Sequence, residues 1–241
     1  MSKLLVIMPV YNTSEYLEQA IESVLQQKDV DLDLCIIDDK STDNSFEIIS
    51  EYSDIDNIII FQNKKNRGTY FSRNRGLELL ESRDYTYFTV HDSDDVSLSD
   101  RYFKMIEMFK NNDIKVLTSS YLRIPEKYIT GDGIDTSKGI LRPASDGGNG
   151  IAMYHIDIFN GIGYQDDIRF GADTDYFWRA QAWCKQNNEK LGLFELPIYF
   201  ARERSGNLKS LHKNRGSYVN KIRSELSNMI SENNFYRPKF D

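Results

Sequence analysis

The sequence predicts an α/β fold built on a doubly wound, mostly parallel central sheet. Through about the first 90 residues, short apolar runs alternate with amphipathic segments, which is typical of strand–helix–strand crossovers. The runs are apolar on consecutive residues, as expected for parallel strands that helices cover on both faces. Two of the runs are followed by acidic residues, at Asp38 and at Asp92. Open α/β sheets bind ligands at this end of their strands, so we expect a binding site there.

Composition and charge narrow the class of protein. The chain has 241 residues, of which 40% are hydrophobic and 28% charged, an ordinary composition for one large globular domain or two small ones. The net charge of −7 argues against non-specific attraction to nucleic acid or to an anionic membrane. Cys35 and Cys184 are too few for a disulfide scaffold, and the opening apolar run is too short for a signal peptide or a membrane span. We therefore expect a soluble, cytoplasmic protein without a transmembrane segment.

Four strands and three helices are expected in the first half. Thr13 or Ser14 can cap the first helix, in which apolar residues recur every three or four positions and form one core-facing stripe. Loops are expected over 9–12 and 63–68. The expected strands are Leu4–Met8, Leu32–Ile37, Ile58–Phe61 and Tyr85–Val90, and the later helices are Ser41–Ile49 and Thr69–Leu80.

The second half is less regular and predicts a smaller mixed region. Glycine and asparagine in the loop Arg142–Gly150 permit positive φ, so we expect a mobile lid or substrate loop there. After Ser205 the chain is polar and mildly basic, and we expect a helical tail packed on the domain. The other expected elements are a helix over Ser99–Phe109, a strand over Val116–Ile124, a hairpin loop over Gly131–Gly139, a helix over Asp173–Trp183 and a strand-like segment over Leu193–Tyr199.

The stretch after the fourth expected strand carries the strongest chemical signal. Asp92, Asp94 and Asp95 fall within four positions, and such carboxylates repel one another by about 1 kcal/mol per pair even in a water-like dielectric. A hard divalent cation, which prefers oxygen ligands from carboxylates and phosphates, would relieve this repulsion. The alternative is an acidic turn that caps the helix beginning near Ser99.

Four segments, in order and with the proper spacing, resemble the family 2 glycosyltransferases of the GT-A fold. They are VIMPVYN at 6–12, IIDDKSTDNS at 36–45, NRGTYFSRNRGLE at 66–78 and VHDSDD at 90–95. A fifth segment, FGADTDYFWRA at 170–180, falls where that family keeps its acceptor-side acid. The stretch from RPA at 142–144 to DYFWR at 175–179 is similar to the spore-coat polysaccharide glycosyltransferase branch. The resemblance covers residues 3–204.

The resemblance implies a domain organisation and an activity. Residues 1–204 would form the GT-A domain, with a nucleotide-sugar-binding half at 1–98 and an acceptor-side half at 99–204, followed by the helical tail at 205–241. The activity would be metal-dependent transfer of a sugar, with inversion at the anomeric carbon, from a nucleotide diphosphate sugar to a hydroxyl group. We place a UDP-sugar first as donor and a glycan first as acceptor. A modified base in DNA is a less favoured acceptor, because the chain as a whole is acidic.

The resemblance also assigns donor-binding residues. Pro9, Tyr11 and Asp39 fall where the family holds the base, and there Asp39 can accept from a base N–H while Tyr11 lies against the ring. The alternative role of Asp39 is to cap the helix that opens at Ser41. Arg73 falls on the segment that faces the diphosphate, where an always-charged planar donor suits contact with phosphate or base.

Asp92 and Asp94 correspond to the D-x-D pair of the family. By resemblance, Asp94 is the direct metal ligand and Asp92 reaches the ribose or a metal-bound water. The ion, Mn²⁺ or Mg²⁺, would bridge the two phosphates and neutralise the charge that develops on the leaving group. Asp95 is expected to start the following helix, and His91 to be a core histidine rather than a metal ligand.

Inversion requires a base that takes the proton of the acceptor hydroxyl on the face opposite the leaving group. Asp173 is the candidate, because it precedes Trp178 by the interval that this branch of the family shows. Asp175, two residues further on, is the rival. Many relatives carry Glu-Asp where this chain has Ala172 and Asp173. The alternative role of Asp173 is to cap the helix Thr174–Trp183, and Trp178 itself is expected in the core.

Other classes of protein fit the sequence less well. The P-loop and Rossmann glycine motifs are absent after the first expected strand, and no G-x-S-x-G marks a serine hydrolase. A sugar-nucleotide nucleotidyltransferase also combines a nucleotide pocket with paired acids and a metal, but the expected Gly-rich basic loop is missing. A catalytically inactive nucleotide-sugar-binding module is the remaining alternative, and the retained acids Asp39, Asp94 and Asp173 argue against it.

Overall fold

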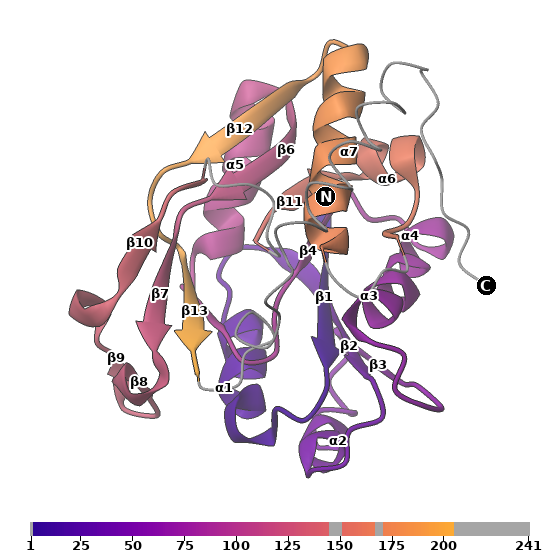
Figure 1. The fold of residues 1–241 in the computed structure, drawn as a ribbon. Coiled ribbons are helices and arrows are strands. Elements are labelled where there is room, and N and C mark those ends of the chain that lie inside the picture. The colour runs from indigo at the N-terminus through magenta and orange to yellow at the C-terminus, as the bar shows by residue number, and fades with distance from the viewer. Residues whose placement is uncertain (1, 145–150, 167–170, 205–241) are drawn as a thin grey trace.

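The computed structural model describes residues 2–144, 151–166 and 171–204. Within these ranges the chain forms a central seven-stranded sheet in the order β12-β6-β11-β4-β1-β2-β3 (Figure 1). The predicted α/β class is therefore confirmed. The strands of this sheet are β1 (Lys3–Val10), β2 (Asp31–Asp38), β3 (Ile58–Gln62), β4 (Tyr87–Val90), β6 (Ile114–Ser119), β11 (Met153–His155) and β12 (Lys190–Phe194).

Neighbouring strands of this sheet run parallel except at β11. β1 pairs in parallel with β2 and β4, β2 with β3, and β12 with β6, whereas β11 is antiparallel to both β4 and β6. The register places Ile7 opposite Val90 on one side of β1 and opposite Cys35 on the other. Because β1, β2 and β4 run in the same direction, the loops that follow them meet at one edge of the sheet.

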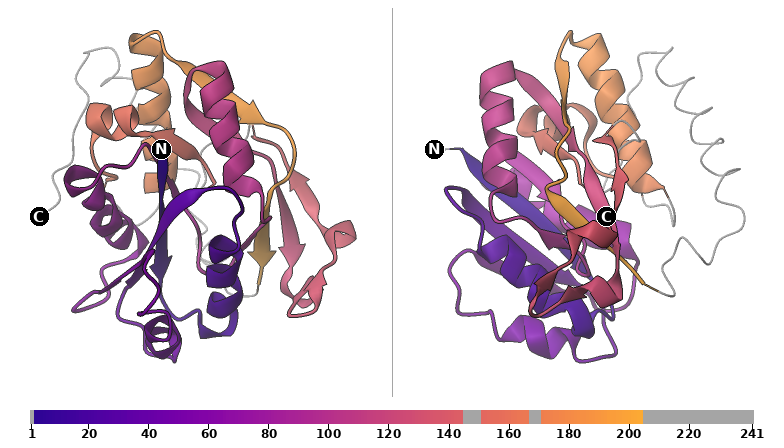
Figure 2. Two further views of the ribbon diagram at one scale, coloured as in Figure 1. Left: turned by 180° about the vertical axis from the view of Figure 1, so that it is seen from behind. Right: turned by 90° about the vertical axis from the view of Figure 1, so that its left-hand side faces the viewer.

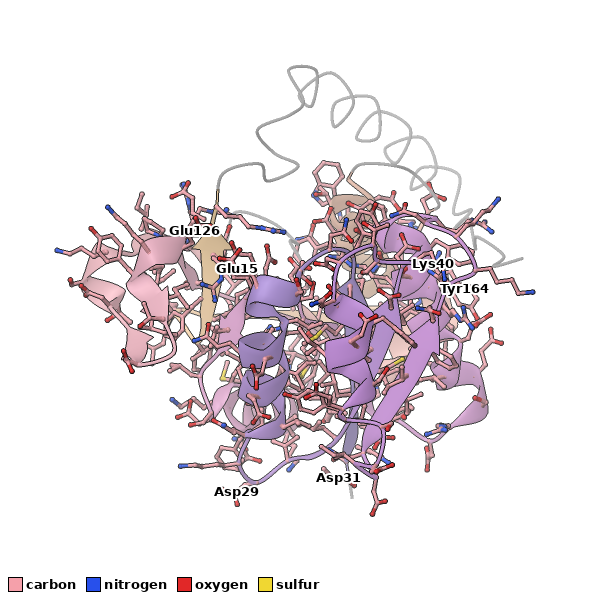
Figure 3. The ribbon with its side chains drawn as sticks, turned by 90° about the horizontal axis from the view of Figure 1, so that it is seen from below. Glu15, Asp29, Asp31, Lys40, Glu126 and Tyr164 are labelled. Carbon is pink, nitrogen blue, oxygen red and sulfur yellow. The ribbon has the colours of Figure 1, made fainter. Side chains whose placement is uncertain are left out.

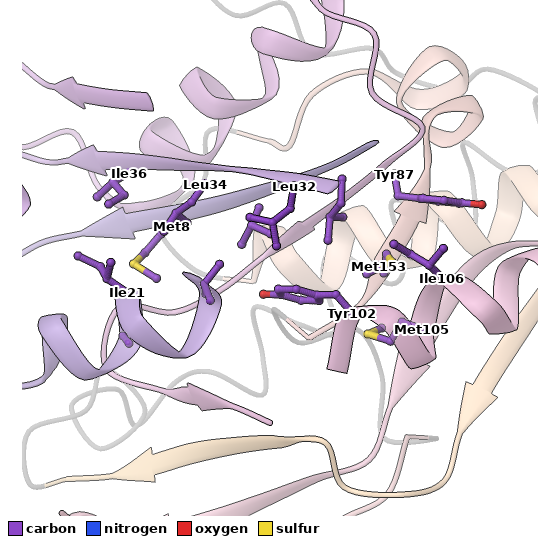
Figure 4. Packing of buried hydrophobic residues seen from close by; sticks show 14 of the residues in the cluster. Met8, Ile21, Leu32, Leu34, Ile36, Tyr87, Tyr102, Met105, Ile106 and Met153 are labelled. Atoms are coloured by element: carbon purple, nitrogen blue, oxygen red, sulfur yellow. The ribbon is translucent and has the colours of Figure 1, made fainter. Parts of the chain in front are cut away.

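Helices cover both faces of the sheet, as the continuously apolar strands predict. One face carries α1 (Ser14–Leu25), α2 (Ser45–Ser50) and α5 (Arg101–Asn112); the other carries α3 (Thr69–Leu77), α4 (Leu79–Ser82), α6 (Ile156–Ile162) and α7 (Ala172–Gln186). Figure 2 shows α5 and α7 on opposite sides of the strands. Alternate residues of β1 enter the two cores, so that Met8 packs in the cluster of Ile21 (Figure 4) and Ile7 packs in that of Leu77. Burying such side chains stabilises the fold by about 1.5–3 kcal/mol each.

The position of α3 depends on Gly76. A Cβ added to Gly76 would lie 2.6 Å from Cγ2 of Ile7, which is closer than side chains can approach. The glycine therefore lets the backbone of α3 lie directly against β1. Because α3 also carries Tyr70 and Arg73, this contact fixes where those side chains stand relative to the ends of the strands.

A second sheet of four strands, in the order β10-β7-β13-β5, stands beside the first. β13 is antiparallel to β5 and parallel to β7. Since β5 directly follows the acidic loop 91–95, this loop connects the two sheets. The strands are β5 (Val96–Ser97), β7 (Tyr121–Pro125), β10 (Ile140–Arg142) and β13 (Tyr199–Glu203), and β8 (Ile129–Thr130) pairs with β9 (Gly133–Ile134) in a separate hairpin.

Helix α1 is hydrogen-bonded to the segment that follows β7 and to the hairpin β8–β9. Tyr16 Oη donates to Glu126 Oε2 at 3.2 Å, and Gln19 Nε2 donates to the carbonyl of Thr130 at 2.9 Å. Figure 3 shows Glu15 of α1 close to Glu126, which follows β7. Helix α1 thus fixes the region around β7, β8 and β9.

Two predicted strands are each divided between the two sheets. The predicted strand Val116–Ile124 separates into β6 and β7 at Ser120, whose N–H donates to the carbonyl of Phe194 at 2.8 Å. The segment Leu193–Tyr199 separates in the same way into β12 and β13, on either side of Pro197. The apolar pattern is the same in both sheets, so periodicity alone does not show where a chain crosses between them.

Pro9 lies inside β1, and the prediction of a loop over 9–12 is wrong at its first two positions. The carbonyl of Ile7 accepts from His91 N at 2.9 Å, and that of Val10 accepts from Asp39 N at 2.8 Å. Along β1, the backbone groups of alternate residues therefore point toward β4 and toward β2. The nitrogen of Pro9, which carries no hydrogen, lies on the β4 side, beyond the last residue of β4. No ladder hydrogen bond is lost, so proline is tolerated there.

Some predictions fall outside the described residues. The loop Arg142–Gly150 leaves them after position 144, and the predicted tail 205–241 lies beyond them entirely. The division of 1–204 at residue 98 stays a prediction. In the ranges that the structure covers, no helix is both long enough and apolar enough to cross a membrane.

Candidate functional site

The acidic loop begins with a buried histidine. His91 is fully buried; its Nδ1 lies 2.9 Å from the carbonyl of Asp92 and its Nε2 lies 3.0 Å from Ser97 Oγ. A carbonyl can only accept, so Nδ1 carries the proton. Burial and the Arg101 guanidinium lower the pKa of His91 to about 3, and the ring is neutral. His91 is thus a core histidine, as predicted, and it orients the peptide of Asp92.

Arg73 joins this loop to α3. Its Nη2 donates to Asp92 Oδ1 at 3.0 Å, and the side chains are 6% and 42% exposed respectively. The Asp92 carboxylate therefore faces solvent while the guanidinium lies beneath it. Arg73 Nε is buried and has no hydrogen-bond partner in the described part of the chain. An unpaired guanidinium N–H of this kind suits an anionic ligand.

Asp94 is more enclosed than Asp92, and its carboxylate faces Arg204. Arg204 Nε lies 2.8 Å from Asp94 Oδ2, but the two atoms are not aligned for a hydrogen bond. The Asp94 side chain is 18% exposed. Burial and the neighbouring Asp92 carboxylate raise the pKa of Asp94, so its charged form is disfavoured without a further cation.

Asp95 braces the loop, and the prediction that it starts the next helix is wrong. Helix α5 begins at Arg101, with Asp100 as its N-cap. The Asp95 carboxylate instead accepts from Tyr199 Oη at 2.7 Å and from Arg202 N at 2.7 Å, both on β13. Burial and the nearby acids raise its pKa well above the ordinary value. Asp95 therefore ties the acidic loop to the second sheet.

Asp39, at the end of β2, shapes the loop that follows β3. Its carboxylate accepts from three donors of that loop, which are Asn63 Nδ2 at 2.7 Å, Arg67 N at 2.9 Å and Gly68 N at 2.6 Å. The amide of Ser41 bonds to Asp38 Oδ1 at 3.2 Å, and helix α2 begins only at Ser45 with Asn44 as its N-cap, so Asp39 does not cap it. Each carboxylate oxygen has two lone pairs, and Asp39 Oδ2 can still accept from a ligand.

The other two predicted base-binding residues lie at the end of β1. Tyr11 is 46% exposed, whereas Pro9 is buried. The next residue, Asn12, accepts from Thr42 N at 2.8 Å, and its own N–H donates to Ser41 Oγ at 3.0 Å. The turns after β1 and β2 are thereby locked together, with the Tyr11 ring presented beside them.

Asp173 lies in the first turn of α7. Its Oδ1 accepts from Thr174 N at 2.8 Å and from Tyr70 Oη at 3.3 Å. The N-cap of α7 is Gly171, so Asp173 does not cap this helix. Burial and the Asp173 carboxylate raise the pKa of Tyr70 to about 12, and the phenol keeps its proton. Tyr70 and Arg73 are three residues apart on α3 and share a face, so this helix links Asp173 with the acidic loop.

The rival acid Asp175 is held in a buried ion pair. Arg179 Nε lies 2.8 Å from Asp175 Oδ2, and the two side chains are 2% and 5% exposed. Arg179 also donates to the carbonyls of Ile162 at 3.0 Å and Tyr164 at 2.8 Å. A buried carboxylate that neutralises a buried guanidinium is badly placed to take a proton from a substrate. The geometry therefore favours Asp173.

Several residues around the acidic loop were not singled out from the sequence. Tyr199 reaches Asp95 from 104 residues away, and Arg202 Nε donates to the carbonyl of Asp94 at 2.8 Å. Arg202 and Arg204 are two residues apart at the end of β13, a period-2 signal that points both to one face. Trp178 packs partly buried on the core beneath α7, as expected.

The paired acids fit a divalent cation that is shared with a substrate. Across the described ranges, no group of three or more His, Cys, Asp or Glu side chains could hold a metal ion alone. Mg²⁺ and similar ions are commonly held by one or two carboxylates, with substrate phosphates and water as the other ligands. Asp92 and Asp94 offer this set of donors.

Comparison with protein families and curated relatives gives consistent matches. The family model described as Glycosyl transferase family 2 matches residues 5–166. An uncharacterized glycosyltransferase of Haemophilus influenzae is 29% identical over an alignment of 231 positions that covers 86% of this chain and 91% of the relative. The putative teichuronic acid biosynthesis glycosyltransferase TuaG of Bacillus subtilis is 31% identical over 141 residues, or 58% of this chain and 53% of TuaG. The matched stretch thus makes up only about half of TuaG.

Solved structures show the same fold. S. aureus TarS 1–349 in complex with UDP-GlcNAc superposes with a TM-score of 0.71 at 17% identity, covering 93% of this chain and 66% of the TarS chain. The mannosyltransferase PcManGT from Pyrobaculum calidifontis, in complex with GDP-Man and Mn²⁺, has a TM-score of 0.67 at 14% identity, with 93% and 64% covered. At these identities the likeness shows the fold alone, and that fold is GT-A.

Proposed function

The chain belongs to glycosyl transferase family 2, and on this premise we propose that it transfers a sugar from a nucleotide diphosphate sugar to a hydroxyl group. The proposed donor is a UDP-sugar in the first place, and the anomeric carbon is inverted. One observation carries the proposal. Arg73 of α3 binds Asp92 of the acidic loop, while Tyr70 of the same helix binds Asp173 of α7. Helix α3 thus lies between two groups of acids. Asp92 and Asp94 would face the diphosphate that leaves, and Asp173 would face the acceptor.

The neighbours of known structure support the class of donor. TarS was crystallised with UDP-GlcNAc and with UDP, and PcManGT with GDP-Man and Mn²⁺. UDP-GlcNAc and GDP-Man are nucleotide diphosphate sugars, in which a base, a ribose and a diphosphate carry the sugar. The loops after β1, β2 and β4 meet at the edge of the sheet where such a ligand would bind.

Three residues are proposed to hold the base and ribose end of the donor. The exposed Tyr11 ring would lie against the base, Pro9 would support it from within β1, and Asp39 would accept from a base N–H. Asp39 would do so while it keeps its bonds to the loop 63–68. Arg73 is proposed to face the diphosphate or the base, where its permanent positive charge suits an anionic partner.

Asp94 is proposed as the direct ligand of Mn²⁺ or Mg²⁺, with Asp92 reaching the ribose or a metal-bound water. When bound, the ion supplies positive charge that offsets the charge on the departing nucleoside diphosphate. Arg204 lies 2.8 Å from Asp94 Oδ2, so it would have to turn away for a cation to occupy that oxygen. Relief of the Asp92–Asp94 repulsion favours this exchange of cations.

Asp173 is proposed as the base of the transfer. The acceptor oxygen forms a bond to the anomeric carbon as the bond from that carbon to the diphosphate oxygen breaks. The hydroxyl proton passes to Asp173, and the nucleoside diphosphate leaves with the bonding electrons. Attack from the side opposite the leaving group inverts the configuration.

The acceptor is proposed to be a hydroxyl of a glycan, and a modified base in DNA is less favoured. The net charge of −7 counts against nucleic acid as a partner. We propose that the reaction takes place in the cytoplasm. The two cysteines are buried and unpaired, which agrees with a reducing compartment.

A panel of donors tests this function. The protein would be incubated with UDP-glucose, UDP-galactose, UDP-GlcNAc and GDP-mannose in Mn²⁺, and nucleoside diphosphate release would be followed by mass spectrometry. We expect release from at least one UDP-sugar. UDP should bind much more tightly with Mn²⁺ than with chelator, and Asp94→Ala should abolish that difference. Equal affinity for UDP with and without the ion would contradict the proposed metal site.

A further inference from the structure

The hydroxyl of Tyr70 has one arrangement of its hydrogen that satisfies both neighbours. The N–H of Gly171 lies 3.1 Å from Tyr70 Oη and can only donate, so the phenol oxygen accepts there. The phenol proton is then left for Asp173 Oδ1, at 3.3 Å. Tyr70 thus fixes the backbone just before α7 and the carboxylate in its first turn at once.

The two oxygens of Asp173 are thereby made different. Oδ1 accepts from Tyr70 Oη and from the N–H of Thr174, whereas Oδ2 accepts no hydrogen bond from any residue in the described ranges. Among the described residues, Oδ1 is thus anchored, and both lone pairs of Oδ2 are left without a donor. A base needs this combination of a fixed direction and an open lone pair, because proton transfer depends on geometry within hydrogen-bond reach.

The ring of Tyr70 also contacts Arg73, which joins α3 to the acidic loop. The guanidinium of Arg73 lies 5.4 Å from the centroid of the Tyr70 ring and donates to Asp92 Oδ1. Gly76 holds α3 against β1 at the level of Ile7, so both side chains stand on a rigid helix. Sites built on helices orient their groups more narrowly than sites on loops.

Resting on the proposed role of Asp173, we propose that Tyr70 is a positioning residue that aims the Asp173 carboxylate at the acceptor hydroxyl. Its ring packs against Arg73, and its hydroxyl selects the oxygen that remains open. Tyr70 does not touch the reacting atoms and takes no proton from the substrate.

The variant Tyr70→Phe tests this, because it removes the hydroxyl and keeps the ring. With water as acceptor and the best UDP-sugar of the panel as donor, kcat should fall about tenfold, the usual effect of one hydrogen bond to a charged group. The KM for the donor should stay within about twofold. The matched control is Tyr52→Phe, which removes a hydroxyl 3.2 Å from Glu22 Oε1 on the opposite face of the sheet and should leave both constants unchanged.

A spectroscopic readout reports the contact independently of turnover. In an assigned amide spectrum, the Gly171 amide proton should move upfield in Tyr70→Phe because it loses its acceptor, and should not move in Tyr52→Phe. An unmoved Gly171 signal, or an unchanged kcat in Tyr70→Phe, would overturn the proposal. The variant Asp173→Asn in the same assay distinguishes the role of Tyr70 from that of Asp173. If it is inactive while Tyr70→Phe is fully active, only the role of Tyr70 fails; if it is fully active, the base assignment fails first.

Discussion

The hydroxyl of Tyr199 donates to Asp95 Oδ2 at 2.7 Å across 104 residues of sequence, and it accepts from the N–H of Asp92 at 3.3 Å. One phenol on β13 therefore holds both Asp92 and Asp95 of the acidic loop 91–95. Burial raises the pKa of Tyr199 far above its usual range, with the neighbouring acids adding to the effect, so the hydroxyl is always protonated. This contact with the second sheet fixes the loop on which Asp92 and Asp94 lie.

Tyr199→Phe should lower the free energy of unfolding by about 1–3 kcal/mol, because the buried Asp95 carboxylate loses one of its two donors. The same variant should weaken Mn²⁺-dependent binding of UDP, since the loop is less well fixed. Urea unfolding and calorimetric titration measure the two effects. The control is Tyr176→Phe, whose buried hydroxyl has no partner in the described part of the chain, and which should be neutral or slightly stabilising. Equal stability of both variants would show that the bond to Asp95 contributes nothing.

The sequence allowed the donor-side acids to be predicted but not what holds them. Asp92 and Asp94 follow a buried strand within a few positions, and local spacing is what sequence patterns record best. The partners of Asp95 and Asp39 come from distant segments, and no pattern in one sequence shows which loops meet. The division of Val116–Ile124 between two sheets escaped prediction for the same reason.

Asp175→Asn should cost about 3 kcal/mol of stability and leave turnover per folded molecule within a few fold. The amide leaves the buried Arg179 guanidinium without its counter-charge, and breaking one side of a buried ion pair is strongly destabilising. Urea unfolding, with activity normalised to the folded fraction, separates the two quantities. Loss of activity at unchanged stability would instead make Asp175 the base.

The pairing of Asp175 was available in the sequence. Asp175 and Arg179 are four residues apart on a predicted helix, a spacing at which opposite charges meet. The spacing does not reveal whether the pair is buried. An exposed ion pair contributes little to stability, whereas breaking one side of a buried pair is strongly destabilising. Burial depends on which face of α7 meets the sheet, and only the assembled fold shows it.

Both cysteines should resist alkylation in the folded protein. Burial raises the pKa of Cys35 and of Cys184 to about 12, against about 8.5 in an unfolded chain. Because the folded pKa is raised, the folded state keeps its thiol protons longer, and stability is lost as pH rises from about 8.5 toward 12. At pH 8, iodoacetamide should label neither site in buffer and both in urea, as followed by intact mass. Rapid labelling of the native protein would contradict this burial.

The variant Asp173→Asn removes the group that we propose to accept the proton of the attacking hydroxyl. The amide keeps the size of the side chain and one acceptor oxygen for Tyr70 and Thr174, but it cannot act as a base. Nucleoside diphosphate release from the best UDP-sugar should fall by about 10²–10⁴-fold. UDP affinity in Mn²⁺ should change less than about threefold, because the residue faces the acceptor, and the melting temperature should stay close to that of the parent protein. Wild-type turnover by well-folded Asp173→Asn would contradict the proposed role of Asp173 and would mean that the base lies elsewhere.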